Sequence, residues 1–123
     1  MTTIKKKIVA VVDDDPGIRK SLHGLLSKFG YAVYTYESAE AFLDVARTSS
    51  ANCLVLDIQL GDISGIELGR ELAAAGLSFP IVFMTNLDDA AIEEQATRLG
   101  CVAYLRKPFS ADVLIEAIVK AIA

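Results

Sequence analysis

Five short apolar runs alternate with segments of helical periodicity along the whole chain, and this alternation constrains the fold more than any other feature. The runs predict strands near 8–12, 32–36, 53–57, 81–84 and 102–106. Strands joined by helices through connections this short favour a parallel sheet that is covered on both faces and built from right-handed crossovers. The expected fold class is therefore α/β, with a doubly wound sheet of five parallel strands.

The segments between the runs place apolar residues on one face of each predicted helix. Pro16 suits the first turn of the first helix, Gly30 suits its C-terminal cap, and Ser38 suits the start of the second helix. Gly76 and Gly100 stand where the third and fourth helices should stop. The positions expected to face the core are Ile18, Leu22, Leu25, Leu26 and Phe29; Phe42, Leu43 and Ala46; Ile66, Leu68 and Leu72; Ile92, Ala96 and Leu99; and Val113, Leu114, Ala117, Ile118 and Ala121.

Length and composition predict a single globular domain over residues 1–123, because 53% of the 123 residues are hydrophobic and no linker interrupts them. The formal net charge of -4 argues against direct binding of nucleic acid, and the one basic run, Lys5–Lys7, is most simply a solvated strand entry. No apolar stretch approaches the ~18 residues of a membrane span. Cys53 and Cys101 fit reduced, buried thiols, so a cytoplasmic protein is expected.

Acidic residues stand at the ends of two of the predicted strands. Asp13 and Asp14 follow the first run directly, and Asp57 closes the third. The carboxyl ends of strands form the ligand-binding edge of an open α/β sheet, so these side chains should gather there. Three carboxylates repel one another unless a positive group holds them. A hard divalent cation with oxygen ligands, Mg²⁺ or Mn²⁺, is the simplest candidate.

Two further polar residues follow later strands. Thr85 comes after the fourth run and Lys107 after the fifth, which places a hydroxyl and an ammonium on the same edge. A carboxylate can attack phosphorus, while a metal ion, an ammonium and a hydroxyl take up charge on the phosphoryl oxygens. The sequence therefore predicts phosphoryl chemistry on an acid.

Four motifs occur in order on successive predicted strands: Val12-Asp13-Asp14-Asp15-Pro16, Leu56-Asp57-Ile58 with Gly65 downstream, Met84-Thr85 and Lys107-Pro108-Phe109. In this order the chain resembles, over its whole length, the receiver domain of two-component response regulators. Arg19-Lys20-Ser21-Leu22 and Ser38-Ala39-Glu40-Ala41-Phe42-Leu43 further resemble the subfamily whose members often have a helix-turn-helix output domain. The resemblance implies a flavodoxin-like (βα)5 fold with strand order 2-1-3-4-5.

The resemblance also implies roles for the acids. Asp57 would be the phosphoacceptor, taking a phosphoryl group from a sensor histidine kinase or a histidine phosphotransfer protein. Asp14 would bind Mg²⁺ directly and Asp13 mainly through water, and Gln59 would offer its backbone carbonyl to the metal. The protein would then be a signalling switch rather than an enzyme.

The remaining residues would bind the phosphoryl group and transmit its presence. Thr85 and Lys107 would contact phosphoryl oxygens, and Tyr104 would change position together with Thr85. The change would reshape the surface of the fourth helix, the fifth strand and the fifth helix, where a phosphorylation-dependent homodimer is a further expectation. Neither nucleic acid nor membrane is an expected direct partner.

Three positions depart from the receiver pattern. Gly61 replaces a common proline, so the loop after the third strand is expected to be more mobile than usual. Asn86 is larger than the usual alanine or glycine and should slow the entry of small phosphodonors. Leu87 offers no hydrogen bond to a hydrolytic water, which predicts a long-lived acyl phosphate.

Two alternatives remain open. A small Mg²⁺ phosphatase with an aspartyl nucleophile would use acids two residues apart after the first strand, and Asp13 and Asp15 have that spacing. That interpretation leaves Asp57 unexplained, and Asp15 also suits a helix cap ahead of Pro16. A degenerate receiver acting only as a scaffold is disfavoured because the acids, the threonine and the lysine are all present.

Overall fold

A single parallel sheet with helices on both faces forms the structure, a computed structural model that describes residues 5–123. The strands are β1 (Ile8–Val12), β2 (Ala32–Tyr36), β3 (Cys53–Asp57), β4 (Ile81–Thr85) and β5 (Ala103–Arg106), in the order β2-β1-β3-β4-β5. The helices are α1 (Pro16–Lys28), α2 (Ala39–Leu43), α3 (Gly65–Ala74), α4 (Ala90–Arg98) and α5 (Ala111–Ile122), with a 3-10 turn η1 (Ala46–Thr48). The predicted fold class and strand order are confirmed.

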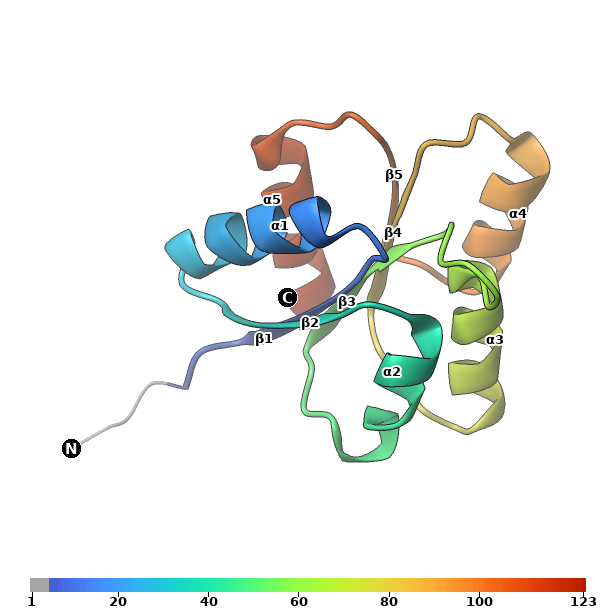
Figure 1. Ribbon diagram of the computed structural model, residues 1–123, viewed down its shortest axis with the longest axis horizontal. Coiled ribbons are helices and arrows are strands. Elements are labelled where there is room, and N and C mark those ends of the chain that lie inside the picture. The colour runs from blue at the N-terminus through green and yellow to red at the C-terminus, as the bar shows by residue number, and fades with distance from the viewer. Residues whose placement is uncertain (1–4) are drawn as a thin grey trace.

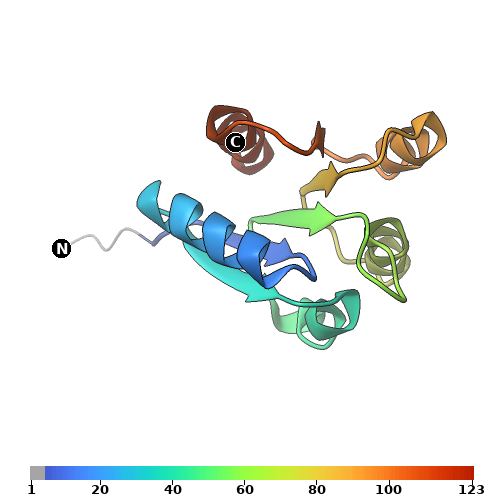
Figure 2. The same cartoon turned by 45° about the horizontal axis from the view of Figure 1, so that its top comes forward.

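The two faces of the sheet bury separate apolar clusters. Helices α1 and α5 cover one face, over Val9, Val11 and Val55, while α2, α3 and α4 cover the other (Figure 1, Figure 2). Because the sheet is covered on both sides, every residue of β3 and β4 is buried, which explains why these strands read as continuous apolar runs. The sheet thereby holds the carboxyl ends of its strands in fixed register.

The strand predictions differ from the structure only at their ends. β4 extends to Thr85, because Thr85 pairs with Arg106 in the ladder, and β5 begins at Ala103. The helix caps are confirmed: Ser38 accepts a hydrogen bond from the Ala41 backbone N–H at 3.0 Å. Gly30, Gly76 and Gly100 follow the ends of α1, α3 and α4, each with a positive φ.

Two residues predicted to face the core are exposed instead. Phe29 is 52% exposed because α1 ends at Lys28 and the chain turns there toward β2. Val113 is 44% exposed because the buried stripe of α5 begins at Leu114 and repeats at Ala117 and Ile118. The prediction of one continuous second helix is also wrong, since α2 ends at Leu43 and Ala46 is buried from η1.

Neither cysteine takes part in a disulfide, as predicted, but only Cys53 is fully buried. Burial raises the pKa of the Cys53 thiol to about 12, and burial likewise raises the pKa of the half-buried Cys101. Within residues 5–123, every helix is too short or too polar to cross a membrane.

Candidate functional site

Polar side chains from four strands meet at the carboxyl edge of the sheet. Asp13 and Asp14 follow β1, Asp57 ends β3, Thr85 ends β4 and Lys107 follows β5. β1, β3, β4 and β5 are neighbours in parallel register, so their carboxyl ends lie side by side. The structure therefore brings all five residues to one edge, as the sequence predicted.

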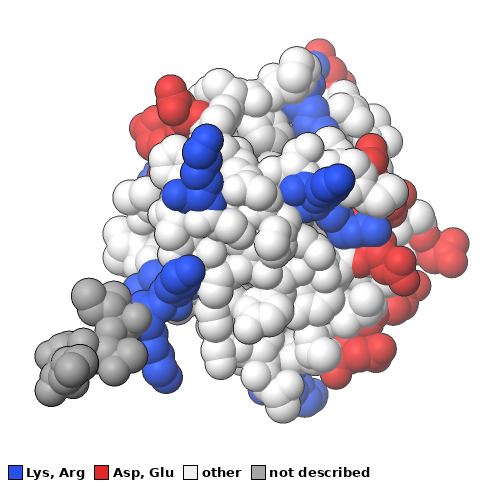
Figure 3. All heavy atoms as spheres, turned by 60° about the vertical axis from the view of Figure 1, so that its left-hand side comes forward, with Lys and Arg blue, Asp and Glu red and all other residues white. Residues whose placement is uncertain are grey.

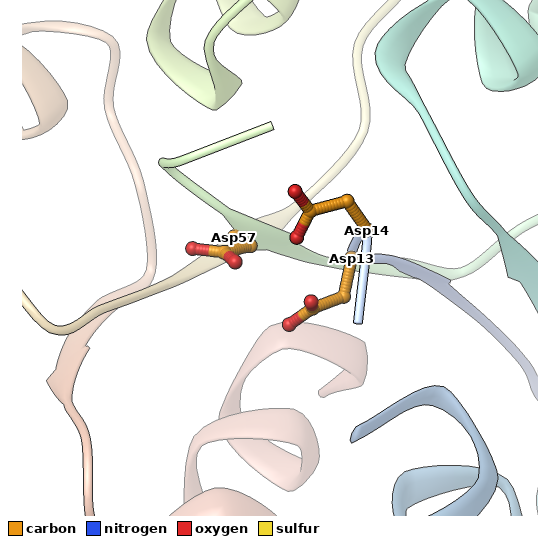
Figure 4. Close-up of side chains that lie close together, drawn as sticks. All are labelled: Asp13, Asp14 and Asp57. Carbon is orange, nitrogen blue, oxygen red and sulfur yellow. The ribbon is translucent and has the colours of Figure 1, made fainter. Parts of the chain in front are cut away.

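The three acids form a compact cluster at this edge. One carboxylate oxygen from each of Asp13, Asp14 and Asp57 lies within 4.8 Å of the others. Figure 4 shows Asp13 and Asp14 projecting from the end of β1 toward the side on which Asp57 projects from β3. Asp13 and Asp57 are buried, whereas Asp14 is exposed, so the cluster is open to solvent on the Asp14 side.

Lys107 bridges the two buried acids. Its Nζ lies 3.2 Å from Asp13 Oδ2 and 3.3 Å from Asp57 Oδ2, and its side chain is only 14% exposed. Burial lowers the pKa of Lys107, but the charges of Asp57 and Asp13 outweigh that effect and raise it overall. The lysine thus stays charged and offsets one of three negative charges.

Backbone groups fix the orientation of both buried carboxylates. Asp57 Oδ1 accepts the Gln59 N–H at 3.1 Å, and Asp13 Oδ1 accepts the Asp15 N–H at 2.9 Å. Burial raises the pKa of Asp57, and Asp13 adds to the rise against the opposing effects of the Gln59 N–H and Lys107. The guanidinium of Arg19 donates to the Asp13 carbonyl oxygen at 2.8 Å, a contact that sequence reasoning missed.

The donor set fits a hard divalent cation. All three clustered groups are carboxylates, which Mg²⁺ prefers together with water. Two negative charges remain after Lys107 is counted, and they are held close together in a partly buried site. Among residues 5–123, no side chain donates a hydrogen bond to the Asp14 carboxylate, so its oxygens are free to bind a ligand from solvent.

Thr85 and Lys107 are held beside this cluster by the sheet. Thr85 is fully buried, and its Oγ1 accepts the Leu87 N–H at 3.0 Å, which leaves the hydroxyl hydrogen available to donate. The Lys107 N–H donates to the Thr85 carbonyl at 2.8 Å and joins β4 to β5. Asp89 caps α4 instead of Thr85, because its carboxylate accepts the N–H groups of that helix.

Tyr104 lies in β5 with its ring against the core cluster of α2, α3 and α4. Its hydroxyl oxygen is buried and has no hydrogen-bond partner among the described residues. Burial, followed by Glu93 and Asp89 of the α4 region, raises the pKa of this hydroxyl. An unpaired buried hydroxyl costs roughly 1–3 kcal/mol. A ring position that exposed the hydroxyl would let it form a hydrogen bond with water.

The remaining predicted positions surround the cluster. Asp15 caps α1 by accepting the Gly17 N–H at 2.8 Å, and it lies outside the acid cluster. Gly61 has a φ of 86°, which proline cannot adopt, so the glycine is required by the loop conformation. Asn86 is exposed and lines a cavity of about 440 Å³ beside Lys107. That cavity, with Ile18, Leu22, Pro108 and Phe109 in its wall, has no signal in the sequence spacing.

Gly65 packs against the backbone at the end of β3, and this contact predicts how a substitution there changes stability. A Cβ at Gly65 would overlap the carbonyl oxygen of Asp57, so Gly65→Ala must displace either α3 or the end of β3. We expect a loss of ~1–3 kcal/mol in the free energy of unfolding. A Cβ at Gly24 in α1 would meet no atom within 4 Å outside its own stretch of helix, so Gly24→Ala should be neutral or stabilising. Urea denaturation of both variants measures the difference, and equal stabilities would contradict the packing argument.

Comparison with known proteins finds a matching family model and several similar regulatory proteins. The family model "Response regulator receiver domain" matches residues 9–119. The transcriptional regulatory protein FixJ of Bradyrhizobium diazoefficiens is 39% identical over 122 residues, which is 99% of this chain and 58% of that protein. The transcriptional regulatory protein TdiR of Thauera aromatica is 36% identical over 115 residues, which is 94% of this chain and 51% of that protein. The chain thus spans little more than half the length of these relatives.

Solved structures agree with this assignment. The crystal structure of FixJ-N superposes with a TM-score of 0.89 at 37% identity, covering 96% of this chain and 94% of that one. Full-length FixJ from B. japonicum superposes with a TM-score of 0.89 at 38% identity, covering 97% of this chain and 59% of that one.

Proposed function

This chain belongs to the response regulator receiver domain family, and from that we propose that residues 1–123 form a phospho-accepting receiver. It takes a phosphoryl group onto Asp57 from a sensor histidine kinase or a histidine phosphotransfer protein. The observation that supports the proposal most is the meeting of three strand-end carboxylates with a lysine that contacts two of them.

The geometry suits acyl-phosphate formation. An Asp57 carboxylate oxygen attacks phosphorus, an O–P bond forms, and the P–N bond to the donor histidine breaks with its electron pair returning to the imidazole. Lys107 and the Thr85 hydroxyl bind the phosphoryl oxygens as charge shifts onto them. Asp13, Asp14, Asp57 and the Gln59 carbonyl would hold Mg²⁺ or Mn²⁺, which when bound neutralises phosphoryl charge.

The acceptor role fits the family better than turnover of a phosphomonoester. In the phosphatase alternative, Asp15 would have to act at the site, yet its carboxylate is engaged in capping α1. The relatives are regulators with further sequence, so a separate output segment is proposed to read the state of this domain. We place the protein in the cytoplasm on the strength of this family, without direct contact to nucleic acid or membrane.

We propose that Thr85 and Tyr104 transmit phosphorylation to the surface formed by α4, β5 and α5. The Thr85 hydroxyl moves to the phosphoryl group and gives up the Leu87 N–H that it now accepts. No hydrogen bond from the described residues holds the Tyr104 hydroxyl in its present position, and we propose that the ring shifts when Thr85 moves. A homodimer that depends on phosphorylation would use the same surface.

Incubation with acetyl phosphate and Mg²⁺ tests the acceptor role, and we expect one phosphoryl group per chain.

Beryllofluoride with Mg²⁺ tests the switch by NMR. We expect backbone amide signals to shift at Asp57, along Thr85–Leu99 and at Tyr104, because the bound beryllofluoride accepts a hydrogen bond from the Thr85 hydroxyl. Shifts confined to the loops around Asp13 and Asp57 would contradict signalling through α4 and β5.

The lifetime of the acyl phosphate gives a further prediction. Hydrolysis needs a water held in line behind phosphorus, and Leu87 offers it no hydrogen bond while the exposed Gln59 side chain could. We expect Leu87→Glu to speed phosphate release by a few-fold, on the order of 1 kcal/mol in the barrier. Leu87→Met is the size-matched control and should leave the rate unchanged. An unchanged or slower rate in Leu87→Glu would show that position 87 does not orient the water.

A further inference from the structure

The outer edge of β2 lacks the usual protection of an edge strand. β2 is one of the two edges of the sheet, and its sequence Ala-Val-Tyr-Thr-Tyr contains no charge and no proline. The opposite edge strand, β5, ends in Arg106 and is followed by Lys107-Pro108. Charges, proline and bulges normally keep an edge from pairing with another chain. β2 has none of these, and its Tyr34 side chain is 54% exposed.

Unpaired backbone groups face outward from this edge. The Ala32 N–H donates to the Lys7 carbonyl, and the Tyr36 carbonyl accepts the Asp13 N–H, so both residues turn their backbone groups toward β1. Backbone groups alternate in direction along a strand, so those of Val33 and Thr35 point away from the sheet. β2 is the last strand on its side of the sheet, so no described strand pairs with its outer edge, although Figure 2 shows α2 close to the end of β2.

We propose that β2 pairs in antiparallel fashion with β2 of a second copy of this chain, about a two-fold axis at Tyr34. Val33 then faces the partner's Thr35, and Thr35 faces the partner's Val33, so each pair exchanges two backbone hydrogen bonds. The two Tyr34 residues face each other at a pair without hydrogen bonds, where side chains approach most closely. Such a contact is self-complementary, as a two-fold interface must be.

A hollow beside Tyr34 has room for the partner's ring. The cavity measures about 280 Å³ and is lined by Ile8, Tyr34, Tyr36, Val45, Thr48, Ser49 and Ser50. It exists because α2 has only five residues and gives way to the short η1, which leaves the face of the sheet over Ile8 and Tyr34 uncovered. Val45, in its wall, is 37% exposed although it is apolar.

The charges around β2 favour a second copy over an unrelated acidic peptide. Lys5, Lys6 and Lys7 line a hollow of about 500 Å³ next to Ala32, at the start of β2, whereas exposed Glu37 and Glu40 follow its end. On the face that Figure 3 shows, basic side chains stand at several places and acidic side chains lie at its upper left and along its right side. Antiparallel pairing places the basic end of each copy beside the acidic end of the other. An acidic peptide would complement only the lysines.

The outer edge of β2 faces away from β1 and β3, whose ends hold the acid cluster, and it is the opposite edge of the sheet from β5. The proposed pairing leaves Asp57 accessible and needs no phosphoryl group. It therefore predicts a dimer of the unphosphorylated protein.

Disulfide trapping tests the register directly, in a Cys101→Ser background that leaves only the buried Cys53. Opposed residues without hydrogen bonds have Cα atoms ~4.5 Å apart, within the range that a disulfide spans. Tyr34→Cys should therefore give a covalent dimer on mild oxidation. Thr35→Cys, one residue along, faces the partner's Val33 and should stay monomeric. Equal trapping of both variants, or none of Tyr34→Cys, would overturn the proposal.

Sedimentation velocity without phosphodonor tests the association itself. The wild type should gain mass with concentration, and Tyr34→Glu should weaken association at least about fivefold, because like charges then face each other on the axis. Val119→Glu is the control, since Val119 is equally exposed, at 55%, on α5. If association weakens only in Val119→Glu, the dimer forms through α5 and the proposal is overturned. The proposal would also be overturned if the wild type is monomeric and the backbone amide NMR signals of Val33 and Thr35 shift when polyglutamate is added, because an acidic peptide would then bind this edge.

Discussion

Replacing Asp57 by asparagine should abolish phosphorylation by acetyl phosphate and Mg²⁺. The amide oxygen of asparagine is a poor nucleophile, so the rate should fall at least ~100-fold, or roughly 2.7 kcal/mol in the barrier. Asparagine can still accept the Gln59 N–H through its side-chain oxygen, so the loop after β3 should keep its conformation. Intact-mass spectrometry should detect one added phosphoryl group in the wild type and none in the variant.

A matched control separates this effect from a general change of charge. Asp62 lies exposed in the loop after β3, and it is not part of the acid cluster. Asp62→Asn should therefore be labelled like the wild type. Undiminished labelling of Asp57→Asn would place the acceptor elsewhere and remove the basis of the proposed function.

Loss of Asp14 should have the second largest effect, on divalent cation binding. Mg²⁺ binding needs negative oxygens to displace its water, and Asp14 is the clustered acid without a lysine partner. We expect Asp14→Ala to weaken Mg²⁺ binding by about tenfold or more, or roughly 1.4 kcal/mol, in titration calorimetry. Because Asp14 is exposed, the free energy of unfolding without metal should barely change.

Asp62→Ala is again the control, because it removes an acid from the same end of the sheet. Its Mg²⁺ affinity should match that of the wild type. Equal affinities in wild type and Asp14→Ala would refute a metal site built on the acid cluster.

The positions of the site residues could be predicted because strand ends are easy to recognise in this sequence. Buried parallel strands are continuous apolar runs, so the first polar residue after each run marks the carboxyl edge. Asp13, Asp57 and Thr85 follow from that rule, and Lys107 comes one residue later, after Arg106. The contacts of these residues cannot be predicted in this way. The direction in which the Lys107 side chain reaches the two carboxylates depends on the loop after β5 and on the burial of that side chain.

Other features depend on tertiary packing that periodicity does not encode. Phe29 has the spacing of a core residue, but the end of α1 carries it outward. The contact of Arg19 with the Asp13 carbonyl depends on how α1 leaves β1, and the unpaired hydroxyl of Tyr104 depends on what surrounds β5. The spacing of residues along the sequence does not indicate any of these three features.

The two contacts of Lys107 join residues that are far apart in the chain. Its partners Asp57 and Asp13 precede it by 50 and 94 residues. Contacts of such long sequence range form late, because closing long loops costs entropy before any contact is gained. Under the proposed acceptor role, a chain still emerging from the ribosome has its acids in place long before its lysine. The site therefore gains its lysine only when β5 has joined the sheet, so under this proposal partly folded copies lack the positive charge that would bind the phosphoryl oxygens.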